Sequence, residues 1–154
     1  MKTLVAYFSA EGTTAAMANK LASAVGADVF EIVPEKPYAP ADIKWTNPLA
    51  RCNREKLGKK DVPVAGSVED WDQYDLVCLG FPIWYYEAPN VVHTFCKGYD
   101  WTGKKVVLFG TSGGAEIGKT AEKLAPDMKG GPEIVHAEVF RSAADLCAVA
   151  ETLK

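Results

Sequence analysis

The stretch that decides the fold is Thr3-Leu4-Val5-Ala6-Tyr7-Phe8-Ser9-Ala10-Glu11-Gly12-Thr13-Thr14, close to the amino terminus. Its first half, residues 3–8, is almost entirely apolar, as expected of a strand buried on both faces of a parallel sheet. Apolar residues at helical spacing follow the second half; they are Met17, Leu21, Ala24 and Val25. The sequence therefore predicts a strand, a tight turn and a helix in direct succession.

The turn, residues 9–14, is small and rich in hydroxyl groups. The first backbone N–H groups of a helix lack partners within the helix, and the helix dipole is positive at that end, so this turn favours a phosphate group. It is not a Walker loop, because the Gly-Lys-Ser/Thr ending is missing, and it does not match the GxGxxG dinucleotide fingerprint. A plain helix start capped by Ser or Thr explains the turn alone equally well.

Length and composition indicate one domain covering residues 1–154. The chain has 154 residues, of which 48% are hydrophobic, enough for a full core. Its formal net charge is −3, with 20 acidic and 17 basic residues, which argues against nucleic-acid binding. Because we find neither an apolar run of membrane-spanning length nor a signal-peptide pattern, we expect a cytoplasmic protein without membrane attachment.

The cysteines and histidines predict no metal site and no disulfide. The four cysteines are scattered and form no CxxC pair; they are Cys52, Cys78, Cys96 and Cys147. We interpret them as small buried hydrophobic residues. The two histidines, His93 and His136, fall in a predicted helix and a predicted strand, so we expect structural or surface roles for both.

Strand and helix patterns alternate along the rest of the chain. Further strands are predicted at Val29–Val33, Leu76–Leu79, Val106–Phe109 and Ile134–Val139. One helix is predicted to begin at Pro89, with the apolar face Val91, Val92, Phe95, Cys96 and Tyr99. Another helix is predicted from the apolar residues Ile117, Ala121 and Leu124. The last helix is predicted to begin at Ser142, with Ser142 and Asp145 as a weak capping pair. Its apolar positions are Leu146, Val149, Ala150 and Leu153. This order predicts an α/β fold, a three-layer α/β/α sandwich with a doubly wound parallel sheet.

One segment interrupts the alternation. Residues 34–74 contain five prolines and little periodicity, so we expect mostly loop, with one helix near Pro48–Leu57. A connection of this length in a compact domain is typical of a functional loop. Trp45 lies within it, and we interpret that residue as a contact with a satellite core in preference to a ligand contact.

Three loops directly follow predicted strands: residues 9–14, 80–89 and 110–114. In a five-stranded doubly wound sheet of order 2-1-3-4-5, ligands bind at the carboxyl ends of the strands beside the switch point. The first loop offers hydroxyls and amides for a phosphate, the second offers aromatic groups for a flat ring, and the third has small residues that allow close approach. Together they suit flavin mononucleotide (FMN).

The chain resembles the flavodoxin family, in particular its short members in which the loop after the third strand reads Gly-x-Pro-Ile-Trp. The resemblance rests on residues 7–14, 80–85 and 110–114, in this order and spacing. It implies a flavodoxin-like sheet of order 2-1-3-4-5 and an FMN site. The residues implied for the phosphate are Ser9, Glu11, Gly12, Thr13 and Thr14; those for the isoalloxazine ring are Pro82, Ile83, Trp84 and Tyr85, with Thr111, Ser112, Gly113 and Gly114 at its far edge.

Some of these positions have a second interpretation. Many family members have Ser or Thr in place of Glu11, and a carboxylate aimed at a phosphate would repel it, so we expect the Glu11 side chain to turn outward while its amide takes part. Trp84 and Tyr85 could instead cover the end of the core. Glu87 is expected near the ring, with an orientation that the sequence does not define.

The resemblance implies an electron carrier that binds FMN non-covalently and shuttles electrons between redox partner proteins, with no catalytic residue of its own. The alternative on the same scaffold is an FMN-dependent NAD(P)H:quinone-type oxidoreductase. A second alternative is a non-redox domain that has lost FMN. Redox partners and oligomeric state are not defined by the sequence.

Overall fold

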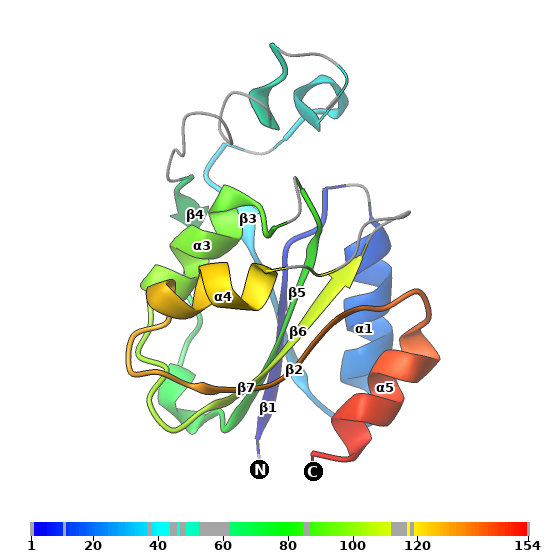
Figure 1. Ribbon diagram of the computed structural model, residues 1–154, viewed down its shortest axis with the longest axis vertical. Helices are drawn as coiled ribbons and strands as arrows, with labels where there is room; N and C mark the ends of the chain where they lie inside the picture. Colours follow the sequence, from blue (N-terminus) through cyan, green and yellow to red (C-terminus); the bar gives the residue numbers. More distant parts are fainter. Residues whose placement is uncertain are drawn as a thin grey trace.

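A five-stranded parallel sheet with helices on both faces forms the centre of the computed structural model (Figure 1). The structure describes residues 2–10, 12–36, 38–43, 46, 49–52, 62–84, 87–111, 117 and 119–153. The sheet is made of β1 (Thr3–Tyr7), β2 (Asp28–Glu31), β5 (Leu76–Pro82), β6 (Lys105–Thr111) and β7 (Glu133–Val139). Every neighbouring pair is parallel and the order is β2-β1-β5-β6-β7. Counted along the chain, this is the predicted order 2-1-3-4-5.

Helices cover the two faces of the sheet in pairs. Helices α1 (Thr13–Val25) and α5 (Ala143–Glu151) lie on one face, and α3 (Asn90–Lys97) and α4 (Thr120–Leu124) lie on the other (Figure 1). The described chain also contains three short 3-10 turns, Pro40–Ile43, Trp71–Gln73 and Ala125–Asp127, and helical backbone at Arg51 and Cys52. The predicted three-layer α/β/α sandwich is confirmed.

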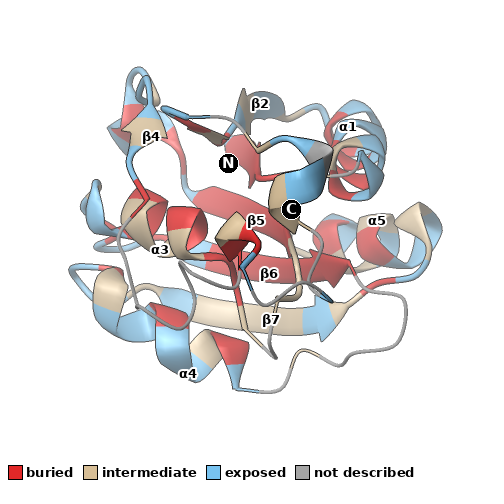
Figure 2. Cartoon of the chain, turned by 90° about the horizontal axis from the view of Figure 1, so that it is seen from above, coloured by how far each residue is buried: buried red, intermediate tan, exposed pale blue. Residues whose placement is uncertain are grey.

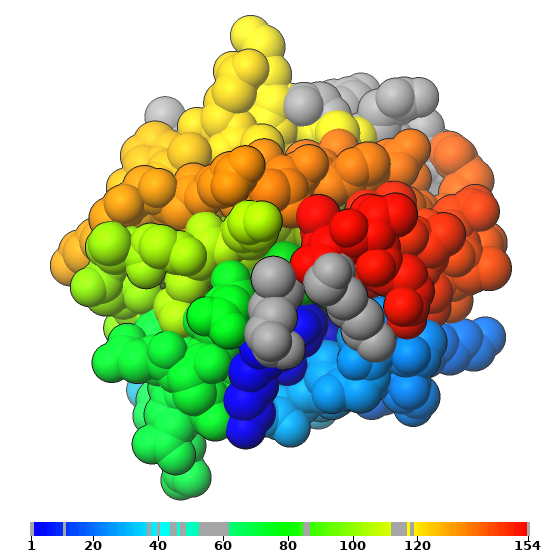
Figure 3. All heavy atoms as spheres, turned by 90° about the horizontal axis from the view of Figure 1, so that it is seen from below, coloured from blue at the N-terminus to red at the C-terminus, as the bar shows by residue number. Residues whose placement is uncertain are grey.

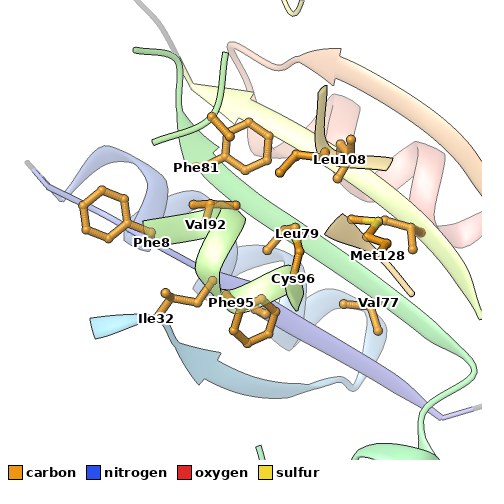
Figure 4. Close-up of a cluster of buried hydrophobic side chains, with 14 of the residues drawn as sticks. Phe8, Ile32, Val77, Leu79, Phe81, Val92, Phe95, Cys96, Leu108 and Met128 are labelled. Carbon is orange, nitrogen blue, oxygen red and sulfur yellow. The ribbon is translucent and has the colours of Figure 1, made fainter. Parts of the chain in front are cut away.

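The central strands divide their side chains strictly between the two helical layers. In β1, Val5 and Tyr7 pack on the α1/α5 side, whereas Leu4 and Ala6 pack on the α3/α4 side. This is the two-residue period of a strand that is buried on both faces. Figure 4 shows the α3 side, where Val92 and Cys96 face Leu79 and its neighbours on the sheet. Seen from above, the central strands are buried, including β5 and β6, and β7 at the edge is only partly covered (Figure 2).

Helix α1 lies between two glycines in the left-handed conformation, Gly12 and Gly26. Met17, Leu21 and Val25 are buried on it as predicted. The prediction for Ala24 was wrong, because this residue is exposed. The buried arc is centred on Leu21 and Val25, and also includes Ala18 and Ala22, which places Ala24 at its margin.

The strand predicted over residues 29–33 is divided in two. β2 is an edge strand that ends at Glu31, and Val29 in it is 44% exposed. After the buried Ile32, residues Val33–Pro34 form β3, which pairs antiparallel with β4 (Val64–Ala65) in a separate small sheet. The backbone N–H of Ile32 still donates to Tyr7 O, so the chain leaves the main sheet only there.

The remaining helices confirm their predicted apolar faces with shifted ends. The predicted helix after Pro89 begins at Asn90 and ends at Lys97, so Tyr99 lies beyond it, stacked on Trp71 with ring centroids 4.4 Å apart. Ile117 precedes α4, and its carbonyl accepts from Thr120 N at 3.1 Å. In α5, the Ser142 hydroxyl caps the helix by accepting from Asp145 N, as predicted.

The long connection is irregular in its described parts, as expected. It contains β3, β4 and two 3-10 turns, while most of the helix predicted near Pro48–Leu57 lies outside the described residues, as does Trp45. The cysteines are free, and Cys52, Cys78 and Cys96 are buried. Burial raises the pKa of Cys78 to about 12, consistent with an inert core residue. In the described part of the chain, no helix is long and apolar enough to cross a membrane and no cluster of ligating side chains could hold a metal ion.

Both ends of the described chain lie at the amino-terminal edge of the sheet. Figure 3, a view from below, places the first residues of β1 next to the last residues of the chain, and Figure 1 places both ends at the same pole. The carboxyl ends of β1, β5 and β6 lie at the opposite pole (Figure 1).

Gly80 provides a test of the packing between β5 and β6. A Cβ atom at this position would lie 2.2 Å from ring carbons of Phe109, its partner across the strands. We expect Gly80→Ala to lower the free energy of unfolding by about 1–3 kcal/mol, because the buried ring must move. Urea unfolding measures this effect. Gly98→Ala is the control, since a Cβ there meets no atom closer than 3.4 Å; an equal loss in both variants would contradict the steric explanation.

Tyr74 predicts an alkaline dependence of stability. Its buried hydroxyl donates to Asp28 Oδ2 at 2.7 Å, and burial, followed by this hydrogen bond, raises the tyrosine pKa from 10.0 to about 12. Because the pKa is raised on folding, the stabilisation is complete below pH 10 and is lost as the pH approaches 12. We expect wild-type stability to fall more steeply than that of Tyr74→Phe between pH 10 and 12. Parallel urea unfolding curves for the two proteins would contradict this.

Candidate functional site

The carboxyl ends of β1, β5 and β6 form the floor of the site. Backbone hydrogen bonds continue past the regular pairing, from Phe8 N to Gly80 O at 2.9 Å and from Ile83 N to Thr111 O at 3.0 Å. The first residues of the three loops are therefore held at fixed positions relative to one another. This is the edge of the sheet where ligands bind in doubly wound folds, and β1 and β5 flank the switch point.

The amino end of α1 is open toward this edge. Gly12 occupies the N-cap position with φ 94° and ψ −14°, a conformation that favours glycine, and no described side chain caps the helix. The first helical hydrogen bond runs from Ala16 N to Gly12 O, which leaves the preceding backbone N–H groups without acceptors inside the helix. The Ser9 hydroxyl accepts from Gly12 N at 3.0 Å, and Thr13 is exposed. Hydroxyls and unpaired N–H groups thus gather at one helix end, as an anion requires.

A buried hydroxyl pair connects the first and third loops. Thr14 Oγ1 lies 2.7 Å from Thr111 Oγ1, and the two residues are 2% and 5% exposed. They are 97 positions apart in the chain, one in the first turn of α1 and the other at the end of β6. Because a buried hydroxyl needs a partner, each threonine fixes the position of the other.

An aromatic cluster lies on the other side of the site. Trp84, which follows β5, is partly buried and packs edge-to-face against Phe8 and Tyr38, with ring centroids 5.7 and 5.4 Å apart. The Arg51 guanidinium lies 4.1 Å above the Tyr38 ring and donates to Lys36 O at 2.6 Å. The long connection therefore reaches the site and supports Trp84. Neither Phe8 nor Tyr38 was predicted as a site residue. Phe8 ends the apolar run of residues 3–8, whereas Tyr38 has no helical or strand periodicity around it.

Gly110 allows the second loop to lie against β6. A Cβ at this position would be 2.8 Å from Ile83 Cδ1 and 3.2 Å from Val139 Cγ2. The Ile83 side chain therefore packs directly over the backbone of β6. This contact explains why a small residue is needed immediately before Thr111.

Glu87 is held by a cation from the neighbouring helix. Its Oε2 lies 3.0 Å from Lys123 Nζ on α4, and its backbone exchanges hydrogen bonds with Trp84 in both directions, at 2.9 and 3.2 Å. The loop from Trp84 to Glu87 is thus closed on itself and attached to α4. The orientation that the sequence left undefined is therefore toward α4.

The structure brings together every described residue of the predicted site. These residues are Ser9, Gly12, Thr13, Thr14, Pro82, Ile83, Trp84 and Thr111. Five predicted residues lie outside the described part of the chain: Glu11, Tyr85, Ser112, Gly113 and Gly114. The ligand contacts of all these residues stay predictions, as does the outward orientation of Glu11.

Comparison with known proteins agrees with this geometry. The family model described as flavodoxin matches residues 2–140. The chain belongs to the flavodoxin family. Among curated proteins, none matches the chain significantly.

Three solved structures illustrate the similarity. A candidate flavoprotein from Bacteroides eggerthii DSM 20697 is 37% identical, covers 98% of this chain and 96% of its own, and has a TM-score of 0.88. One from Bacteroides uniformis ATCC 8492 is 33% identical, with 97% of each chain covered and a TM-score of 0.88. A flavoprotein from Lactobacillus acidophilus NCFM, solved in complex with FMN, is 24% identical, covers 96% of this chain and 98% of its own, and has a TM-score of 0.73. The last of these supports the fold alone.

The hydroxyl pair can be tested by a double-mutant cycle. We expect Thr14→Val or Thr111→Val to lower the free energy of unfolding by about 1–3 kcal/mol, because each leaves one buried hydroxyl unpaired. The double variant, in which both hydroxyls are replaced, is expected to lose less than the sum of the two. Urea unfolding of the FMN-free proteins measures the free energy of unfolding of the wild type and the three variants. Strictly additive losses would show that the two hydroxyls do not interact.

Proposed function

We propose that the protein binds FMN non-covalently at the carboxyl edge of its sheet and carries electrons between redox partner proteins. The observation behind the proposal is the convergence of the open end of α1, Thr111 and Trp84 at one edge of a flavodoxin sheet. Membership of the flavodoxin family, in which the similar Lactobacillus acidophilus protein was solved in complex with FMN, supports the choice of cofactor. The location of the switch point, between β1 and β5, supports the choice of edge.

The described residues fit the phosphate end of FMN. Gly12 leaves the helix end open, since nothing lies within 4 Å of a Cβ built there, and α1 has no acidic residue in its first turn. Ser9, Gly12, Thr13 and Thr14 would hold the phosphate through hydroxyl and backbone N–H groups, together with the amide of Glu11. A phosphate dianion is stabilised at such a helix start by the dipole and by the unpaired donors.

The opposite side of the site fits the flat ring. Pro82, Ile83, Trp84 and Tyr85 would line the isoalloxazine, and residues 111–114 would close its far edge. Trp84 is supported by two perpendicular rings, so its own position does not depend on a ligand. Bound FMN would supply the electron-transfer chemistry, and the protein would set its potential and access.

Charges near the ring would tune that potential. The Glu87 carboxylate, taken alone, would disfavour added negative charge on the flavin, but Lys123 at 3.0 Å offsets much of it. The formal net charge of −3 is consistent with docking to basic partner surfaces. We therefore expect a carrier of moderate potential, with partner choice set by the surface around the site.

Trp84 offers a direct test of the ring site. We expect the purified protein to bind FMN with one-to-one stoichiometry, and Trp84→Ala to raise the dissociation constant about three- to tenfold by removing an aromatic contact. Trp84→Phe, which keeps an aromatic face, is expected to retain most of the affinity. Quenching of flavin fluorescence measures the FMN dissociation constant of all three proteins. A colourless protein that does not take up added FMN would refute the proposal and leave the non-redox domain.

The same preparation distinguishes a carrier from a reductase. If the protein is a carrier, NADPH is oxidised only when a separate flavodoxin reductase is added. The reductase then reduces the bound FMN, and the carrier passes the electrons on to cytochrome c. Rapid oxidation of NADPH by the FMN-loaded protein alone, with a quinone as acceptor, would instead establish the oxidoreductase.

A further inference from the structure

His93 lies between two carboxylates beside the proposed ring site. It stands on α3, and its side chain is only 16% exposed. Its Nδ1 is 2.5 Å from Asp127 Oδ2, and its Nε2 is 3.2 Å from Glu87 Oε1. Asp127 belongs to the 3-10 turn after α4, and Glu87 belongs to the loop after β5. The imidazole thus connects three separate segments.

The chemistry of this arrangement depends on the proton count of the ring. An ionised carboxylate only accepts hydrogen bonds, and a neutral imidazole has a single N–H to donate. Both contacts of His93 are therefore hydrogen bonds at the same time only when both ring nitrogens carry a proton. Loss of one proton leaves one of the two carboxylates facing a nitrogen lone pair.

Glu87 connects this change to the loop that would hold the ring. Its two carboxylate oxygens are divided between His93 and Lys123, and its backbone is paired with that of Trp84. Among the described residues, Asp127, Glu87, Lys123 and His93 form one group of charged side chains, and its net charge becomes more negative by one when His93 loses its proton. The proton on His93 thus both restrains Glu87 and cancels one negative charge beside Trp84.

Among the described residues, two further cations and one thiol lie on the elements packed against His93. On its own helix, Lys97 lies one turn further along and is exposed. From α4, the Lys123 ammonium contacts Glu87. Burial and, after it, the charge of Asp127 raise the pKa of the Cys96 thiol on α3.

We propose that His93 is a pH-dependent positioning residue for FMN: its protonated ring holds Glu87 and, through the backbone pair, Trp84 in the positions that the isoalloxazine requires, and loss of the proton weakens FMN binding. This inference rests on the proposed function, because it assigns the loop to the FMN site. It goes further in naming a group on α3, outside the proposed ring site, whose protonation controls the strength of FMN binding.

Because the chain has only two histidines, His136 can serve as the control for His93. His136 lies on the edge strand β7, where its Nε2 is 3.0 Å from Glu138 Oε2. The FMN dissociation constant is measured by flavin fluorescence from about pH 5.5 to 8.5, the range in which histidine titrates. We expect the wild-type constant to rise about tenfold over this range, the equivalent of one charge-assisted hydrogen bond. His93→Gln should bind FMN at the weak, high-pH level and keep only the dependence that comes from the FMN phosphate, whose second pKa is about 6. The control His136→Gln should keep the wild-type profile.

A second variant guards against a folding defect in the first. In Glu87→Gln the amide can accept from, or donate to, the histidine ring, so one contact is satisfied in either protonation state and the pH dependence should shrink. Thermal unfolding of the FMN-free variants monitors the fold. A wild-type profile that coincides with the His93→Gln profile overturns this inference while FMN binding stands. Absence of FMN binding by the wild type at every pH refutes the proposed function, and this inference with it.

Discussion

The parallel pairing of β1 with β5 is the constraint on which the rest of the molecule depends. It brings Tyr7 opposite Gly80, residues far apart in the chain, and so places the loops after the two strands side by side. The neighbouring strand β6 can pair with β5 because Gly80 leaves room for the Phe109 ring. Three loops then begin at the same edge, and the hydroxyl pair and the aromatic cluster form from residues that this pairing has already brought together.

The parts of the fold that could be predicted are those with short-range periodicity. A strand buried on both faces reads as a continuous apolar run, and β1, β5 and β6 were located in this way. The cap of α5 could also be predicted, because Ser142 caps this helix through a local hydrogen bond. The predicted ends of some elements were less accurate. β2 ends where Ile32 enters the core, and Tyr99 lies beyond its predicted helix because it stacks on Trp71; both are tertiary effects.

The candidate site was predictable where it follows strands and unpredictable where it depends on distant contacts. Thr14, Trp84 and Thr111 each stand directly beside a recognised element, so their convergence followed from strand order. Tyr38 and Arg51 reach the site through an irregular connection, and no spacing rule relates them to Trp84. The partners of Glu87 come from α3 and α4, whose packing the sequence could not specify side chain by side chain.

Both ends of the described chain lie at the pole opposite the carboxyl ends of β1, β5 and β6. An attachment at either end, whether an affinity tag, a fused reductase or a linker to an electrode surface, would therefore leave the carboxyl edge of the sheet facing outward. The molecule can be anchored without obstructing the edge through which electrons are proposed to pass. For voltammetry, this orientation would present the loops to soluble partners in the bulk solution.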